Sequence, residues 1–171
     1  MPELFTIRLA TPEDAGAIAW HRARMFQDMG EVTPPMFEVL RAKSFDYLRN
    51  ALTCGNYVGW LATAADSPST IIGGAGIALR DVSPHPLVRS NGEVQVAEGR
   101  HGIILNVFTE PEWRRLGIAS SLLERMVDWA RTERLDRLVL HASNEGRAVY
   151  ERFGFVATNE MRFGDDLKSV T

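Results

Sequence analysis

The feature of this chain that most constrains its fold is a stretch in its second half, residues 102–131. It predicts a strand, a sharp turn and a helix in immediate succession. The apolar run 102–109 has the length and composition of a buried strand, and Glu110 and Pro111 end it. After the turn, apolar residues recur with helical spacing at Ile118, Leu122, Met126 and Trp129. We therefore expect the strand to lead directly into an amphipathic helix that packs against a sheet.

The turn between this strand and this helix carries residues suited to an anion. The first N–H groups of a helix have no partner inside it and lie at the positive end of its dipole, so a phosphate or pyrophosphate binds well there. Gly117 and Ala119 would allow close approach, and Arg114 and Arg115 add charge and fork-shaped donors. The spacing Arg-x-x-Gly-x-Ala matches neither a triphosphate-binding loop nor a dinucleotide-binding loop, so a nucleoside triphosphate is not expected. The two arginines could also be a solvated charged pair.

Two segments together resemble the GCN5-related N-acetyltransferase (GNAT) family. The first matches that family's acyl-CoA-binding pattern, Gln/Arg-x-x-Gly-x-Gly/Ala, through Arg114, Gly117 and Ala119. The second, residues 144–155, is similar to a later helix of the family that carries an Asn near its start, a Tyr, and a closing Gly-Phe. One short pattern occurs often by chance, but two in the right order do not. The resemblance spans essentially the whole chain and is strongest from residue 102 to 155.

The resemblance implies an α/β (α+β) fold in which helices flank a mixed, mostly antiparallel central sheet, with residues 1–171 forming a single N-acetyltransferase domain. The residues themselves predict a compatible order, β-α-α-β-β-β-α-β-α-β. Besides the central strand and helix, we expect helices at 11–29, 31–52 and 143–154. The further expected strands are 4–10, 57–64, 70–81, 135–142 and 155–163.

Two stretches have less regular patterns. Residues 83–100 predict a long loop with a short strand at 93–97, which we expect to border the acceptor pocket. Gly73, Gly74 and Gly76 interrupt an expected strand, which indicates a bulge or close packing, or else a smooth floor under a substrate. In the resembled family the first two helices wall the acceptor site. The residues expected to tune the substrate are therefore Arg24, Met25, Met29 and Glu31, although either methionine could simply fill space.

The same resemblance implies an enzyme that uses acetyl-CoA as acyl donor. It would move the acetyl group to a primary amine of a small molecule or a protein by direct attack in a ternary complex. The central strand would hold a bulge and part from the next strand at Asn106 to Thr109, and the pantetheine arm would add to its free edge there. A backbone N–H near Val107 or Phe108 would stabilise the thioester oxygen, and the helix start would hold the pyrophosphate. The implied cofactor-binding residues are Asn106, Val107, Phe108, Thr109, Arg114, Arg115, Leu116, Gly117, Ile118, Ala119, Ser120 and Asn144.

The resemblance also implies a catalytic acid. Tyr150 resembles the family's general acid, since a phenol with an ordinary pKa of about 10 can protonate the departing thiolate. Tyr150 could equally pack a helix end, and Asn144 could be a helix cap. The base is left open, because Asn106 stands on the strand where many relatives carry Glu, and an amide cannot take up a proton in that way. The candidate bases are His101, Glu98, His141 and Glu31.

The departure at Asn106 keeps a second hypothesis open, a non-catalytic acyl-CoA sensor or interaction module on the same fold. The chain has a net charge of −3 and a pI near 5.8, so it offers no basic surface for nucleic acid or an anionic membrane. We expect a cytoplasmic protein without a metal, and a homodimer is left open. The single cysteine, Cys54, is expected to be a small buried residue. A cationic acceptor would suit acidic residues at Glu31, Glu98 or Asp165 and Asp166.

Overall fold

The computed structural model describes residues 4–162 and 164. The chain divides into two compact units, Met1–His141 and Ala142–Thr171, and each is described by itself. In the described part of the chain, no helix combines the length and the hydrophobicity that crossing a membrane requires.

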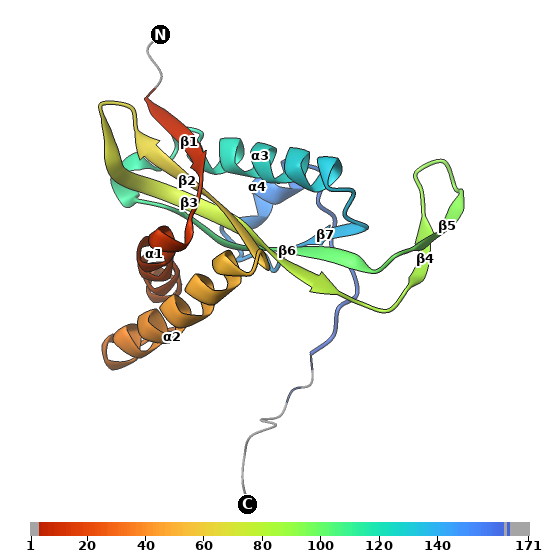
Figure 1. Ribbon diagram of the computed structural model, residues 1–171, viewed down its shortest axis with the longest axis horizontal. Coiled ribbons are helices and arrows are strands. Elements are labelled where there is room, and N and C mark those ends of the chain that lie inside the picture. Colours follow the sequence, from red (N-terminus) through yellow and green to blue (C-terminus); the bar gives the residue numbers. More distant parts are fainter. Residues whose placement is uncertain (1–3, 163, 165–171) are drawn as a thin grey trace, which may run out of the picture. The chain divides into compact units, whose positions relative to one another are not determined.

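The first unit is built on a five-stranded sheet in the order β1-β2-β3-β6-β7 (Figure 1). Neighbouring strands are antiparallel, except that β6 and β7 are parallel. The mixed, mostly antiparallel sheet flanked by helices is therefore confirmed. The strands are β1 (Phe5–Leu9), β2 (Tyr57–Ala64), β3 (Ser67–Asp81), β6 (Arg100–Thr109) and β7 (Arg137–Val139).

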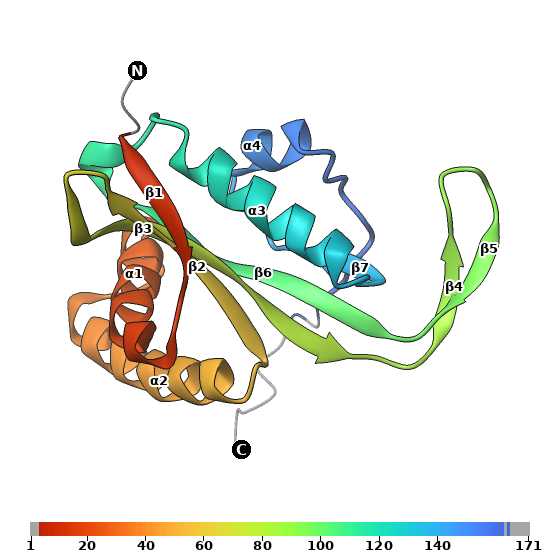
Figure 2. The same ribbon diagram turned by 45° about the horizontal axis from the view of Figure 1, so that its top comes forward.

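Helices cover both faces of this sheet, with α1 (Ala15–Asp28) and α2 (Pro34–Thr53) on one face and α3 (Ile118–Thr132) on the other (Figure 2). A 3-10 turn, Pro12–Asp14, precedes α1. The carboxylate of Asp14 accepts the backbone N–H of Thr11 at 2.8 Å and also pairs with Arg8, so the chain turns sharply from β1 into the helix. The expected strand–helix succession at 102–131 is confirmed, because β6 and α3 lie within two residues of their predicted limits.

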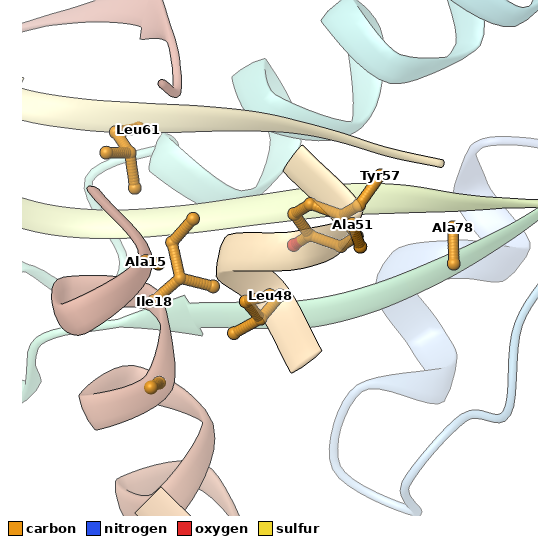
Figure 3. Close-up of a cluster of buried hydrophobic side chains, with 8 residues drawn as sticks. Ala15, Ile18, Leu48, Ala51, Tyr57, Leu61 and Ala78 are labelled. Atoms are coloured by element: carbon orange, nitrogen blue, oxygen red, sulfur yellow. The ribbon is translucent and has the colours of Figure 1, made fainter. Parts of the chain in front are cut away.

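The core between the sheet and the first two helices is made of small and aliphatic side chains around one tyrosine (Figure 3). The ring of Tyr57 is 2% exposed, and the side chain of Leu48 packs in the same cluster. On the opposite face, α3 buries Leu122, Leu123 and Met126 completely. Burying an aliphatic side chain of this size contributes about 1.5–3 kcal/mol, so these two layers hold the sheet in place.

The glycines of β3 are explained by close packing. A Cβ at Gly76 would lie 2.1 Å from the Tyr57 ring, and one at Gly74 would lie 2.9 Å from Leu61. A Cβ at Gly73 would lie 2.9 Å from the backbone oxygen of Phe108. Only glycine leaves space for these groups, which supports the packing interpretation of this stretch.

The predicted loop at 83–100 is instead a two-stranded hairpin, β4 (His85–Val88) and β5 (Val94–Ala97), which extends away from the sheet (Figure 1). A tight turn closes it, in which the Gly92 N–H donates to the oxygen of Arg89. Cys54 is exposed, not buried, because α2 ends at Thr53 and Cys54 caps it at the surface. The short strand expected at 93–97 is confirmed as β5, whereas the loop expected around it and the burial expected for Cys54 were wrong.

The end of the chain is less regular than expected. The strand expected at 135–142 is limited to Arg137–Val139. In the second unit the expected helix is reduced to α4 (Arg147–Arg152). Residues 155–162 form no strand, and residue 163, the end of that expected strand, lies outside the described residues.

Candidate active site

A β-bulge in β6 is the central feature of the candidate site. Gly74 pairs with Phe108 and Gly76 pairs with Leu105, so the single residue Ala75 faces both Asn106 and Val107. Asn106 has φ 60°, a left-handed conformation that asparagine tolerates better than most residues. The extra residue re-aims the strand at the position where the sequence predicted thioester binding.

The side chain of Asn106 joins α1 to the core beneath the bulge. It is 4% exposed, its Oδ1 accepts a hydrogen bond from Arg22 at 2.8 Å, and its Nδ2 donates to the Tyr57 hydroxyl at 3.0 Å. Burial raises the pKa of Tyr57, so its hydroxyl stays protonated. Through these side-chain contacts Asn106 holds the bulge in a defined position and orients Arg22.

One edge of β6 lacks a partner strand beside the bulge. The parallel pairing with β7 covers only His101 to Ile103, whereas β3 pairs along the other edge as far as Thr109. Among the described strands, none pairs with the β7-side edge from Ile104 to Thr109. Backbone groups on that edge can therefore accept an added strand-like ligand. Val107 and Thr109 are half-buried there, and Phe108 is buried.

The start of α3 has the backbone shape of an anion-binding turn. Arg115 has φ 65° and Gly117, the residue before the first helical turn, has φ 87°. No side chain caps the helix, and the first helical bond is from the Ser121 N–H to the Gly117 oxygen. The N–H groups of Ile118, Ala119 and Ser120 precede this bond, so they are available to a ligand. A Cβ at Gly117 would meet no protein atom within 4 Å, which leaves open space for that ligand.

Arg114 and Arg115 differ in their surroundings. The Arg114 guanidinium pairs with Asp28 at 2.8 Å and donates to the backbone oxygen of Thr109 at 3.0 Å. Its contacts tie the turn to the end of α1 and the end of β6. Arg115 and Leu116 are exposed beside the helix start. The sequence did not distinguish the two arginines. In the structure, Arg114 positions the turn before α3 through its contacts with Asp28 and Thr109.

A pocket of about 340 Å³ adjoins the bulge. It is lined by Arg22 from α1, by a face of α2, and by two consecutive β6 residues: Leu40, Lys43, Ser44, Tyr47, Leu48, Leu105 and Asn106. Its volume is within the range of small-molecule sites. A second hollow of about 410 Å³, lined by Pro12, Glu13, Phe45, Arg49 and Thr53, includes no residue of β6 or of the α3 turn. Because the first pocket adjoins the bulge and includes Asn106, it is the candidate acceptor site.

A buried histidine lies near the end of β6. His21 is 4% exposed, stacks on Phe108 with ring centroids 4.8 Å apart, and has its Nε2 3.4 Å from a Glu110 carboxylate oxygen. Burial, assisted by the charge of Arg24, lowers the pKa of His21 to about 4. Burial raises the pKa of Glu110. Neutral His21 therefore faces a carboxylate that its N–H can approach.

The four base candidates from the sequence are scattered. His101 lies five residues before the bulge on β6, about 15 Å along a strand, and contacts His85 with ring centroids 5.0 Å apart. Glu98 and Glu31 are exposed and do not line the pocket, and His141 is exposed. The hairpin 83–100 contributes no lining residue either. None of His101, Glu98 and Glu31 lines the pocket beside the bulge.

The second unit holds Asn144 and Tyr150. Asn144 is exposed in the turn before α4, whose N-cap residue is Gly146, and in this turn the Ser143 hydroxyl accepts the Gly146 N–H at 3.1 Å. Tyr150 is half-buried and packs edge-on against Phe155, with ring centroids 6.1 Å apart. Burial raises the pKa of Tyr150, so the phenol carries its proton at neutral pH. The cap interpretation of Asn144 is wrong because Gly146, not Asn144, is the N-cap residue of α4.

Several residues of the site were missed from the sequence, namely Arg22, Lys43, Tyr47 and Tyr57. A signal existed for Arg22, which stands four residues after Ile18 and seven after Ala15 on the buried face of α1. A charged residue in an apolar stripe indicates a buried polar contact. Tyr57 had no such signal, because it begins an ordinary strand.

Comparisons with known proteins agree with this geometry. Residues 17–155 match the model of the acetyltransferase (GNAT) family. A GCN5-related N-acetyltransferase from Ralstonia eutropha JMP134 superposes with a TM-score of 0.80 at 25% identity, covering 94% of this chain and 98% of that chain. A predicted acetyltransferase from Clostridium acetobutylicum, solved with acetyl-CoA, has a TM-score of 0.75 at 30% identity, covering 95% and 96%.

A search of curated proteins finds no significant match. The family match extends over most of the chain and includes both the α3 turn and α4. Members of this family use acetyl-CoA. The chain therefore belongs to the GNAT family and is an N-acetyltransferase.

Proposed function

We propose that this protein transfers the acetyl group of acetyl-CoA to a primary amine by direct attack in a ternary complex. The observation that carries the proposal is the bulge of β6, which joins an unpaired strand edge to a pocket that Asn106 lines. Donor and acceptor can then approach one point from two sides. Such proximity replaces a bimolecular encounter, which is a large part of what catalysis requires.

The donor would be held by backbone groups. The pantetheine arm adds to the open edge of β6 at Val107 and Thr109, and the pyrophosphate binds the N–H groups of residues 117–120 and the exposed Arg115. An N–H at the bulge, near Val107 or Phe108, donates to the thioester oxygen. Its hydrogen bond strengthens as negative charge develops on that oxygen.

The proposed reaction uses the hydroxyl of Tyr150 as the acid and water as the proton acceptor. The amine nitrogen attacks the thioester carbonyl carbon, the C–S bond breaks, and the thiolate takes the proton of the Tyr150 hydroxyl. The amine gives up one proton to water, and Tyr150 is reprotonated from solvent. A raised pKa suits Tyr150 to this role, because the phenol must be protonated when the thiolate departs.

The test measures thiol release from acetyl-CoA with a panel of primary amines. A Cys54→Ser background is used throughout, because exposed Cys54 would react with the thiol reagent. We expect Tyr150→Phe to lower kcat about 10²-fold or more while acetyl-CoA binding is retained. Phe155→Leu is the matched control, since it loosens the packing of Tyr150 but keeps the hydroxyl.

Two results would contradict the proposal. Undiminished kcat in Tyr150→Phe would remove Tyr150 as the acid. Binding of acetyl-CoA without turnover of any amine would favour the non-catalytic module instead.

A further inference from the structure

The candidate acceptor pocket carries positive charge. Arg22 and Lys43 both line it, and its lining residues in the described part of the chain include no carboxylate. Of the acids considered for a cationic acceptor, Glu31 and Glu98 do not line the pocket, and Asp165 and Asp166 lie outside the described residues. A cationic acceptor would therefore meet like charges in this pocket.

Arg22 is held in place by a neutral group rather than by a carboxylate. One nitrogen, Nη1, donates to Asn106, and the guanidinium lies 4.9 Å from the centre of the Phe26 ring. A guanidinium has five N–H donors, so most of them are not used by this one hydrogen bond. Burial lowers the pKa of Arg22, and in the described part of the chain the groups that oppose this effect are the phenols of Tyr57 and Tyr47 rather than a carboxylate. A half-buried cation without an anion is costly, and a bound anion would offset that cost.

The face of α2 that lines the pocket adds further polar groups. Leu40, Lys43, Ser44, Tyr47 and Leu48 follow the i, i+3, i+4, i+7, i+8 spacing of a single helix face. Lys43 and Tyr47 are exposed, whereas Ser44 is buried. The cationic and hydroxyl groups thus lie on the same side as Arg22, with leucines beside them.

We propose that the acceptor is a small amine that carries an anionic group, a carboxylate or a phosphate, bound by Arg22 and Lys43. The inference rests on the proposed function, because it takes this pocket as the acceptor site. Arg22 contacts the bulge residue Asn106, so an anionic group bound by Arg22 would lie beside the bulge, where the proposed transfer takes place. A pocket of about 340 Å³ suits such a compact molecule.

The test compares acceptors that differ only in the anionic group. One arm pairs β-alanine with propylamine, for a carboxylate, and the other pairs 2-aminoethyl phosphate with ethanolamine, for a phosphate. We expect the anionic member of at least one pair to have a kcat/KM about tenfold higher or more, the size of a charge-assisted hydrogen bond. The arm that shows the preference identifies the anion. Equal or lower kcat/KM for both anionic members would overturn the proposal.

Variants of the pocket identify which residue causes the preference for an anionic acceptor. We expect Lys43→Gln to raise the KM of the anionic acceptor and to reduce its advantage over the neutral partner about tenfold, with Lys43→Arg restoring most of it. Arg49→Gln is the matched control, since Arg49 is another cation of α2 that does not line this pocket. A loss shared equally by anionic and neutral acceptors, or an equal loss in Arg49→Gln, would contradict an anion subsite.

A binding measurement separates this proposal from the proposed function. Ligand-observed NMR with β-alanine and 2-aminoethyl phosphate, without acetyl-CoA, should show binding that Lys43→Gln weakens. If these probes bind there but no amine is acetylated, the anion subsite stands and the transfer proposal fails. If neutral amines are acetylated and neither probe binds, the transfer proposal stands and the subsite fails.

Discussion

Replacing Asn106 should destabilise the protein through three identifiable losses. In Asn106→Ala the hydrogen bonds to Arg22 and Tyr57 disappear, at about 1 kcal/mol each. The Tyr57 hydroxyl, in a side chain 2% exposed, loses its donor at a cost of about 1 kcal/mol or more. Alanine at φ 60° adds about 1–2 kcal/mol of backbone strain. The sum is roughly 4 kcal/mol, or a fall in Tm of about 10 °C for a chain of this size.

A second variant separates the backbone from the side chain. Asn106→Gly loses the same hydrogen bonds but adopts φ 60° without strain, at an entropic cost of about 0.5–1 kcal/mol. It should therefore be more stable than Asn106→Ala by about 0.5–1 kcal/mol. Urea unfolding of both variants and the parent gives the free energies. A loss below about 1 kcal/mol in Asn106→Ala would refute the account of the bulge, as would an alanine variant more stable than the glycine variant.

Two further predictions concern the faces of the sheet. Gly76→Ala should cost about 1–3 kcal/mol in urea unfolding, because its Cβ would lie 2.1 Å from the Tyr57 ring, and no loss would mean that the ring moves aside. Burial lowers the pKa of His21 to about 4, so below about pH 6.5 the unfolded chain binds a proton at His21 that the folded chain does not bind. The free energy of unfolding therefore falls as pH falls. Between about pH 7.5 and 5 the loss from His21 should be roughly 2 kcal/mol, and Glu110, whose raised pKa acts in the opposite sense, should reduce it. His21→Gln should show a shallower fall, and an unchanged slope would exclude His21 as its cause.

Much of the fold followed from local patterns in the sequence. The strand at 57–64 was predicted with its observed limits, and the Thr11-Pro12 start of the first helical segment is confirmed as a 3-10 turn leading into α1. These features depend on residues near one another in the chain, such as the contact of Asp14 with Thr11. Local periodicity and capping therefore suffice to place them.

The site required contacts between distant parts of the chain. The bond of Arg22 to Asn106 spans 84 residues, and that of Arg114 to Asp28 spans 86. No spacing rule predicts such pairs. From the sequence alone, Asn106 was therefore noted as standing where many relatives carry a Glu base, and Arg114 was predicted to bind the pyrophosphate. The bulge was expected only from the family resemblance, and the pairing confirms it; local patterns could not show it, because an extra residue in β6 is defined by its register with β3. Arg22 and Lys43 line the pocket beside the bulge, whereas Glu31 and Glu98, which the sequence offered for a cationic acceptor, do not.

The most direct test of the central claim is the thermal midpoint with and without excess acetyl-CoA, in the parent and in Gly117→Glu. At about a hundred times its dissociation constant the ligand should stabilise the parent by about 2.7 kcal/mol, a rise of roughly 5–10 °C for this chain length. Gly117→Glu should show no rise, because its carboxylate would stand in the open space before α3 and repel the pyrophosphate. An equal rise in both proteins would contradict the site at the start of α3, and no rise in the parent would contradict acetyl-CoA as its ligand.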